Sequence, residues 1–380
     1  MQTKSSRLTF SPSSVNVSFE IENRPLLRKP RKMKKNLLLD MNNLFCRVKY
    51  AVHDSDTDMY VSLICNGIFT MIRESYNRFT PDNVLIFCDG HRSWRKDVYP
   101  RYKANRVKTD KTAREIEQDE AAMEFLRDNL VPLFKDKTAI PVIDGDRLEA
   151  DDLIATFIYD HPDDMNIIVT TDNDFIQLLT PKVVIYNSMT NRIITCAGVL
   201  DIKSNKPVHF EIKDGKIYTG KTAVLLEREE PTVPYNDWVQ YALFMKCIRG
   251  DASDNIESAY PRAPEKSTKN RIGLREAFES LYGDCFAWNS VMKSTWKNLL
   301  GEEQSVEAAY LRNRQLIDLK ELPADLRESA RTFIGVELNK TVPQGITMHL
   351  SKFLNKYECV RMLSELSSFS KVFTQKYNGG

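Results

Sequence analysis

Short apolar runs alternate with stretches of helical periodicity over the first half of the chain. Apolar runs bounded by polar or turn-forming residues are typical of buried strands, whereas apolar residues three or four apart are typical of helices. The sequence predicts strands within residues 36–45, 83–94, 139–146, 166–179 and 182–187. It predicts helices at 57–79 and 110–134, and directly after the third and fourth strands. This alternation indicates an α/β fold with a mainly parallel central sheet and helices on both faces.

The second half of the chain has a different pattern. Residues 191–234 contain FEIKDGKIYTG, in which a DG turn separates two alternating flanks, so we expect a β-rich insertion there. From residue 235 onward the periodicity is helical. Helices are predicted at 235–249, 271–282, 286–299, 303–319, 323–335 and 352–366. The C-terminal part, including residues 301–380, is therefore predicted to be a helical region.

Charge is distributed unevenly along the chain. The first 35 residues carry nine Lys or Arg against two Glu, which leaves 45 basic and 50 acidic residues for the rest. Residues 1–34 are predicted to be a basic flexible tail, either a simple extension or an arm for nucleic acid or a partner. Because the remaining body has a net charge of −5, it does not have the charge of a generic DNA-coating protein. Any basic function must therefore be local.

The cysteines and apolar runs exclude other classes. Seven Cys residues are scattered without a CxxC pair, so reduced thiols fit better than a disulfide framework or a zinc site. No apolar run reaches the ~18–20 residues of a membrane-spanning helix, and no secretory signal is recognisable. We expect a cytoplasmic protein, a monomer with no membrane contact.

Acidic residues follow the predicted strands. Asp40, Asp89 and Asp172 each end a buried run, and in an open α/β sheet this edge is where sites form. Further carboxylates are expected at the same edge. They are Glu149, Asp151 and Asp152 in EADD, Asp174 in TDND, and Asp251 and Asp254 in RGDASDN. Any single Asp is more often a helix cap than a ligand, so the argument depends on the whole set.

The type of side chain indicates the type of metal. Many carboxylates without His or Cys suit Mg²⁺ or Mn²⁺ rather than zinc. This number of ligands suggests two ions. Two ions about 3.5–4 Å apart can hold both the attacking and the leaving oxygen of a phosphodiester displacement.

These motifs, taken together, resemble those of the flap endonuclease and 5′-nuclease superfamily. The resemblance covers roughly residues 35–300 and is greatest to its T-even bacteriophage RNase H branch. It is carried by LLLDMNNLF, IFCDG, SWRKDVYPRYKANR, EADD, TDNDFIQLL and GDASDN. It implies a PIN-like 5′-nuclease fold, with a helical arch or gateway at residues 91–134 and a helix-hairpin-helix-like DNA-binding region at 235–300.

The resemblance also implies metal ligands. Asp40, Asp89, Glu149 and Asp151 would frame the first Mg²⁺ site, with Asp152 close by or acting through water. The second would be framed by Asp172, Asp174 and Asp254, together with Asp251. Helical geometry alone places Asp152 better than Asp151 relative to Glu149, so the choice of direct ligand stays open.

The basic stretch after Asp89 is the candidate phosphate-binding segment. Residues 91–114 carry nine Lys or Arg against two Asp, with Trp and Tyr interleaved. Basic groups bind phosphates and aromatic rings stack on unpaired bases, although a solvated, charge-rich helix would have the same composition. The resemblance assigns Lys103 and Arg106 to the scissile phosphate. We further expect Tyr102 to stack on a base, and Arg95 and Lys96 to steer the substrate.

One segment departs from the family pattern. The superfamily commonly has a GIG hairpin after the last acidic motif, and here that segment reads NIESAYPRAPEKSTKNRIGLREAF. The K⁺ site associated with that hairpin is therefore not carried over. Backbone binding could come instead from exposed basic residues of this segment. They are Arg262, Lys266, Lys269 and Arg271.

The predicted function is structure-directed 5′→3′ exonuclease and flap endonuclease activity with RNase H-type removal of RNA primers in phage DNA replication. The expected partners are DNA with a 5′ flap or nick and RNA–DNA hybrids, with a single-strand-binding protein and a sliding clamp as further candidates. Alternatives are a PIN-like ribonuclease or a non-catalytic DNA-binding protein of the same fold. An α/β phosphatase fits less well, because LLLDMNN lacks a nucleophilic DxD.

Overall fold

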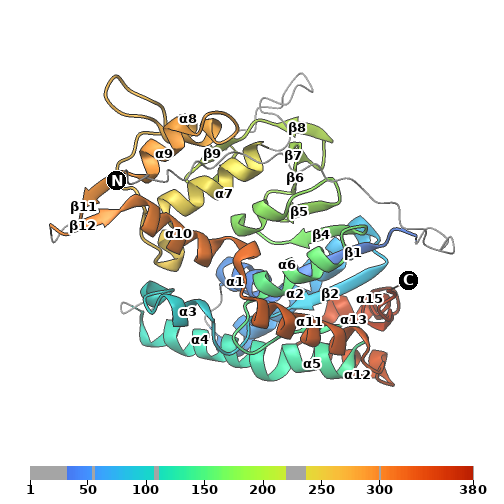
Figure 1. Cartoon of the computed structure of the whole chain (residues 1–380). Coiled ribbons are helices and arrows are strands. Elements are labelled where there is room, and N and C mark those ends of the chain that lie inside the picture. Colours follow the sequence, from blue (N-terminus) through green and yellow to red (C-terminus); the bar gives the residue numbers. More distant parts are fainter. Residues whose placement is uncertain (1–31, 54–55, 107–110, 220–236, 299–300, 380) are drawn as a thin grey trace, which may run out of the picture. The chain divides into compact units, whose positions relative to one another are not determined.

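The structure is a computed structural model of the 380-residue chain (Figure 1). It describes residues 32–53, 56–106, 111–219, 237–298 and 301–379. Most of the predicted basic tail, and residues 220–234 of the predicted insertion, lie outside these ranges. None of the helices in the described ranges is both long and apolar enough to span a bilayer.

An eight-stranded mixed sheet forms the centre, in the order β3-β2-β1-β4-β5-β6-β7-β8. Its strands are β1 (Lys35–Asp40), β2 (Asn83–Phe87), β3 (Val142–Ile143), β4 (Met165–Val169), β5 (Val183–Asn187), β6 (Arg192–Thr195), β7 (Gly198–Asp201) and β8 (Lys206–Val208). Strands β1 to β5 pair in parallel, whereas β5 to β8 pair antiparallel. The carboxyl ends of β1, β2, β3 and β4 therefore share one edge.

Helices cover both faces of this sheet, as predicted. Those that precede the second half of the chain are α1 (Met41–Ala51), α2 (Thr57–Phe79), α3 (Arg95–Val98), the 3₁₀ turn η1 (Ala104–Arg106), α4 (Ala113–Glu124), the π-helical η2 (Phe125–Leu130), α5 (Val131–Lys137), α6 (Ala150–Asp160) and the 3₁₀ segment η3 (Asn173–Leu178). Leu37 and Leu39 of β1 pack into one core with α1, α2 and α5, while Leu38 packs into another with α6. This alternation is the pleat of a strand that is buried on both sides.

The C-terminal half is mostly helical. Its helices are α7 (Asp237–Arg249), the 3₁₀ turn η4 (Ala252–Asp254), α8 (Leu274–Ser280), α9 (Phe286–Met292), α10 (Val306–Ile317), the 3₁₀ turn η5 (Leu319–Glu321), α11 (Ala324–Leu338), α12 (Ile346–Lys356), α13 (Val360–Ser364), α14 (Leu366–Phe369) and α15 (Lys371–Thr374). Helix α10 lies beside α7 (Figure 1). Helix α11 packs on the α6 face, and α12 packs against α5.

Two helix predictions were wrong at their ends. Residues of the predicted helices 286–299 and 303–319 form a hairpin of β11 (Thr295–Lys297) and β12 (Glu303–Ser305). The indole Nε1 of Trp296 donates a hydrogen bond to the carbonyl of Ala259 at 2.9 Å, and the ring packs on the α7–α8 cluster. This contact with a distant segment favours an extended backbone that local periodicity does not indicate.

The predicted β-rich insertion extends the central sheet. Strands β6, β7 and β8 continue it antiparallel from β5, and only β9 (Glu211–Lys213) and β10 (Lys216–Tyr218) form the separate hairpin around the DG turn. No disulfide bond links the seven cysteines, all of which lie in the described ranges.

Candidate active site

Three strand-end carboxylates begin the site. Asp40 is the N-cap of α1, and its carboxylate accepts hydrogen bonds from the Asn43 amide at 3.1 Å and the Thr170 hydroxyl at 3.2 Å. Asp89 accepts from the amide of Ala150 at 2.9 Å, at the start of α6. Asp172 is the N-cap of η3. The N–H groups at these helix starts orient the carboxylates, because they have no partner within their own helix.

The electrostatics show that these carboxylates are neighbours. Burial, followed by the negative charges of Asp89 and Asp172, raises the pKa of Asp40 to about 7. The pKa of Asp89 is also raised, first by burial and then by Glu149, although the N–H of Ala150 opposes the shift. Like charges held together in a partly buried place disfavour their own ionisation. This edge therefore has the negative charge that a bound cation would stabilise.

The EADD segment surrounds a buried arginine. The side chain of Arg95 is only 2% exposed, and its guanidinium donates to Glu149 at 2.7 Å, Asp152 at 2.9 Å and Asp151 at 3.3 Å. The charge of Arg95 is turned inward among carboxylates, so substrate steering by this residue stays a prediction. Burial alone would raise the pKa of Glu149, but Arg95 and Lys103 outweigh it and lower that pKa to about 2.

The contacts of Asp151 and Asp152 differ. The side chain of Asp152 is completely buried, and its oxygens accept from Arg95, from the indole of Trp94 at 3.1 Å and from the amide of Glu149 at 3.1 Å. The Asp151 side chain is 21% exposed. Asp152 thus completes a capping box at the start of α6, a position compatible with its expected place close to the metal or acting through water. Asp151 keeps an accessible carboxylate.

Tyr102 joins the two predicted ligand groups. Its hydroxyl lies 2.9 Å from a carboxylate oxygen of Glu149 and 2.9 Å from one of Asp254. The residue is only 2% exposed, and stacking on a base, which would need an open ring face, stays a prediction. The ring is covered because it packs with Leu316 and Ile317 of α10.

Lys103 and Arg106 lie at the open side of the acidic cluster. The ammonium of Lys103 pairs with Glu149 and lies 4.9 Å from the centroid of the Tyr102 ring. Lys103 has a positive φ of 56°, and its amide donates to the carbonyl of Asp254 at 2.8 Å. Such a left-handed backbone costs on the order of 1 kcal/mol, and it often marks a functional position. The guanidinium of Arg106 is 57% exposed and lies 2.7 Å from Asp254.

A buried lysine holds the second acidic group. Lys246 on α7 is 4% exposed, and its ammonium pairs with Asp174 and lies 2.9 Å from Asp251. Burial would raise the pKa of Asp251, but Lys246 outweighs it, with a hydrogen bond from Ser253, and lowers that pKa to about 2. Sequence reasoning missed Lys246. The available signal was a single charge inside the apolar stretch ALFMKCI, since lysine is rarely buried without a partner.

Basic side chains pair with most of the carboxylates after the three strand ends, namely Glu149, Asp151, Asp152, Asp174, Asp251 and Asp254. In the part of the chain that the structure describes, no three Asp, Glu, His or Cys side chains lie in an arrangement that would hold a metal ion. Arg95, Lys103, Arg106 and Lys246 instead occupy the carboxylate oxygens. The all-oxygen donor set and the raised pKa of Asp40 nonetheless fit a hard divalent cation rather than zinc.

The remaining predicted residues are exposed. Arg262, Lys266, Lys269 and Arg271 lie on the loop between η4 and α8, and Lys96 lies on α3. The Arg271 guanidinium is 5.8 Å from the centroid of the Tyr260 ring. These side chains are accessible to a phosphate backbone.

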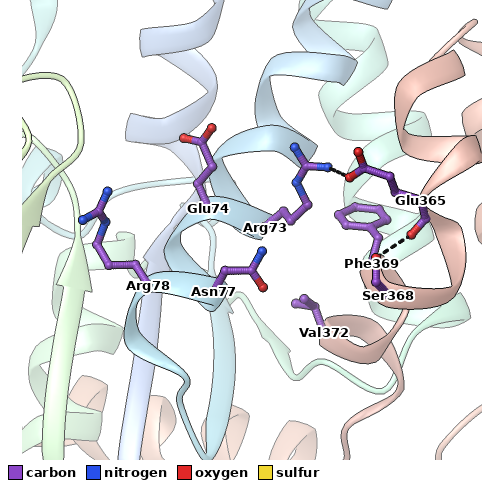
Figure 2. A pocket seen from close by; sticks show the side chains of 8 residues that line it. All are labelled: Arg73, Glu74, Asn77, Arg78, Glu365, Ser368, Phe369 and Val372. Atoms are coloured by element: carbon purple, nitrogen blue, oxygen red, sulfur yellow. Dashed lines mark hydrogen bonds and ion pairs between the residues drawn. The ribbon is translucent and has the colours of Figure 1, made fainter.

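A separate groove of about 700 Å³ lies between α2 and the C-terminal helices (Figure 2). Its walls carry Arg73 and Arg78 on α2, and Phe369 and Val372 from α14 and α15. Arg73 is paired with Glu365. This end of α2 leads into the start of β2, whereas the carboxylates follow strand ends, so the groove belongs to the opposite edge of the sheet.

Comparison with known proteins finds a similar domain for residues 35–203. Residues 35–203 match the 5′-3′ exonuclease, N-terminal resolvase-like domain. A 5′-3′ exonuclease of Buchnera aphidicola subsp. Schizaphis graminum is 24% identical over 307 residues, covering 79% of this chain and 82% of that protein. A DNA polymerase I of Rhizobium leguminosarum is 30% identical over 154 residues, 37% of this chain, and the match spans only 13% of that protein.

Solved structures share the fold. The bacteriophage T5 D15 flap endonuclease, in a complex with DNA and metal ions, has a TM-score of 0.51 and 18% identity, covering 85% of this chain and 99% of its own. The T5 5′-exonuclease with bound zinc has a TM-score of 0.50 and 18% identity, covering 80% and 100%. Residues 35–203 are therefore similar to the 5′-3′ exonuclease, N-terminal resolvase-like domain, in agreement with the resemblance to the flap endonuclease and 5′-nuclease superfamily.

Proposed function

We propose that this protein is a metal-dependent 5′ nuclease. It would hydrolyse phosphodiester bonds near the 5′ end of a DNA flap or nick and of RNA primers on RNA–DNA hybrids, in phage DNA replication. One observation carries the proposal: carboxylates from separate segments meet at one sheet edge beside two accessible cations. The family match and the DNA-bound structural relative support it.

Each group at the edge has a proposed role. Asp40, Asp89, Glu149 and Asp151 would bind one Mg²⁺, and Asp172, Asp174, Asp254 and Asp251 a second, with Mn²⁺ as a substitute. Two such ions supply an activated water and neutralise charge on the scissile phosphate. Lys103 and Arg106 would leave their carboxylate partners and bind that phosphate. Phosphate oxygens accept charge-assisted hydrogen bonds from Lys103 and Arg106 as carboxylate oxygens do, so these two side chains would exchange one anionic partner for another.

The first test is cleavage of labelled substrates. A 5′-labelled flap and a labelled RNA–DNA hybrid would be incubated with the full chain in Mg²⁺ or in EDTA. We expect Mg²⁺-dependent release of short 5′ products. The Asp40→Asn/Asp172→Asn variant should lose this activity by about a thousand-fold or more, since metal ions supply several kcal/mol of transition-state stabilisation.

The matched control is Asp56→Asn, which changes the exposed N-cap of α2 and should leave cleavage unchanged. Relative rates on the two substrates would separate flap processing from primer removal. Binding of the flap without cleavage would contradict the nuclease and favour a DNA-binding protein. Cleavage confined to single-stranded RNA would favour a PIN-like ribonuclease.

A further inference from the structure

The C-terminal end of α10 contacts three of the segments that form the site: the EADD group through Arg95, the TDND segment, and the loop that bears Asp251 and Asp254. Helix α10 lies outside the residues that match the nuclease domain family. Its last turn and the residue pair that follows, residues 313–319, include five residues that are at most 5% exposed. They are Asn313, Leu316, Ile317, Asp318 and Leu319. We call this segment the α10 clamp.

The first contact is with the EADD group. The Nε of Arg95 donates to the carbonyl of Leu316 at 2.8 Å, while its two Nη atoms bind Glu149 and Asp152. A guanidinium has a planar fork of donors, so fixing Nε also fixes the direction of the other donors. The clamp thus determines where Arg95 holds the carboxylates.

The second contact is with the TDND segment. The side-chain amide of Gln177, three residues after Asp174, accepts from the Leu319 amide at 2.8 Å and donates to the Ile317 carbonyl at 3.1 Å. The same amide nitrogen donates to the backbone carbonyl of Asp174 at 2.8 Å. Gln177 therefore connects the clamp directly to the backbone that carries a predicted ligand.

The third contact is with the loop that bears Asp251 and Asp254. The amide nitrogen of Asn313 is completely buried and donates to the carbonyls of Cys247 at 2.9 Å and Glu257 at 2.8 Å. These two carbonyls flank the loop on either side. The apolar cluster of Tyr102, Cys247, Ile256, Leu316 and Ile317 fills the space between the three contacts.

We propose that the α10 clamp is a positioning element for the metal ligands, with Asn313 and Gln177 as its positioning residues. The proposal rests on the proposed function and deepens it. The three acidic segments come from separate parts of the chain, and each is held by hydrogen bonds to the same seven-residue stretch. Because ligand geometry sets metal affinity, loosening one contact should weaken metal binding without removing a ligand.

The test uses Gln177→Met and Asn313→Leu in the full chain. We expect each variant to need about ten-fold more Mg²⁺ for half-maximal flap cleavage, the lower end of the effect of groups that orient metal ligands. Without DNA, the rise in melting temperature at a fixed, subsaturating Mg²⁺ concentration should be smaller than in wild type. This second readout does not depend on catalysis.

The matched control is Asn83→Leu. Asn83 is also a buried amide, 1% exposed, that donates to Asn36 at 2.8 Å, but it lies at the start of β2, on the opposite sheet edge. The Asn83→Leu variant should have a lower melting temperature than wild type in EDTA, and it should need the same Mg²⁺ concentration for half-maximal cleavage. The positioning role would be overturned if Gln177→Met and Asn313→Leu behaved as this control does. If wild type neither cleaved nor responded to Mg²⁺, the proposed function itself would fail.

Discussion

The surroundings of individual carboxylates in this site shift their pKa values in opposite directions. Arg95 and Lys246 are buried beside carboxylates. The charge of Arg95 helps to lower the pKa of Glu149 to about 2, and the charge of Lys246 does the same for Asp251. Asp40 has no such cation among its largest influences, and its pKa rises to about 7. The negative charge at Asp40 is therefore the part of the site for which the metal-free protein has the least compensation.

We expect Asp40 to make the metal-free protein less stable as pH rises. The pKa of Asp40 is about 7 in the folded protein, against the ordinary value of 3.8 expected in the unfolded chain. Between pH 3.8 and about 7 the folded state therefore binds more protons than the unfolded state. Stability then falls with rising pH in that window, by at most about 4 kcal/mol. Asp40→Asn removes the charge but keeps the helix cap. In EDTA at pH 8 the variant should unfold at higher urea than wild type, and at pH 4 the difference should vanish.

Asp56→Asn is the control for this experiment, because it changes a helix cap of the same type on α2. Its unfolding midpoint should shift little at either pH. An Asp40→Asn variant that is no more stable than wild type at pH 8 would show that the charge of Asp40 is already compensated.

At the scale of elements, helix starts hold the carboxylates, whereas a loop presents the exposed basic side chains. The starts of α1, α6 and η3 orient carboxylates through capping hydrogen bonds. The loop between η4 and α8 instead presents exposed cations. It contains none of the predicted metal ligands, the last of which, Asp254, ends η4. Catalysis and duplex binding should therefore be separable by mutation.

Replacing Lys266 and Lys269 with Ala should weaken binding of flap DNA. Each lost phosphate contact should reduce the salt dependence of the binding constant by about 0.9 in log–log slope. The maximal cleavage rate should be nearly unchanged, because neither side chain lies among the carboxylates. Titration of labelled flap DNA at several salt concentrations measures this effect. Lys352→Ala, an exposed change on α12, should leave the slope unaltered. An unchanged slope in the double variant would exclude the loop from backbone binding.

At the scale of the whole molecule, the acidic edge is assembled from distant parts of the chain. The carboxylates come from five places: the ends of β1, β2 and β4, the start of α6, and the loop after α7. Folding must bring these like charges together, which costs free energy. A ligand that binds only the assembled edge stabilises the whole fold.

We therefore expect millimolar Mg²⁺ to raise the melting temperature relative to EDTA. Stabilisation follows RT ln(1 + [Mg²⁺]/Kd), or about 2.7 kcal/mol at 100 times Kd. Differential scanning calorimetry would measure the shift. The Asp40→Asn/Asp172→Asn variant should show little of it. An equal shift in that variant would mean that Mg²⁺ binds elsewhere.

Much of the fold could be predicted, because strands and helices leave local signals in the sequence. Helix α2 occupies the predicted range 57–79, β2 and β5 lie within the predicted apolar runs, and β1 and β4 each begin one residue before theirs. The β11–β12 hairpin could not be predicted in this way. Its strands are three residues long, and a carbonyl 37 residues away holds Trp296.

The order of strands and acidic residues along the chain indicates which carboxylates can meet, since Asp40, Asp89 and Asp172 end or follow strands whose ends share one edge. Which cation pairs with which carboxylate depends on packing between distant segments. Arg95 and Lys96 are adjacent and carry the same charge, yet Arg95 is buried in the acidic group and Lys96 is exposed. The reason is that burial depends on what packs over a segment. Here the cover is α10, whose Leu316 lies 221 residues from Arg95.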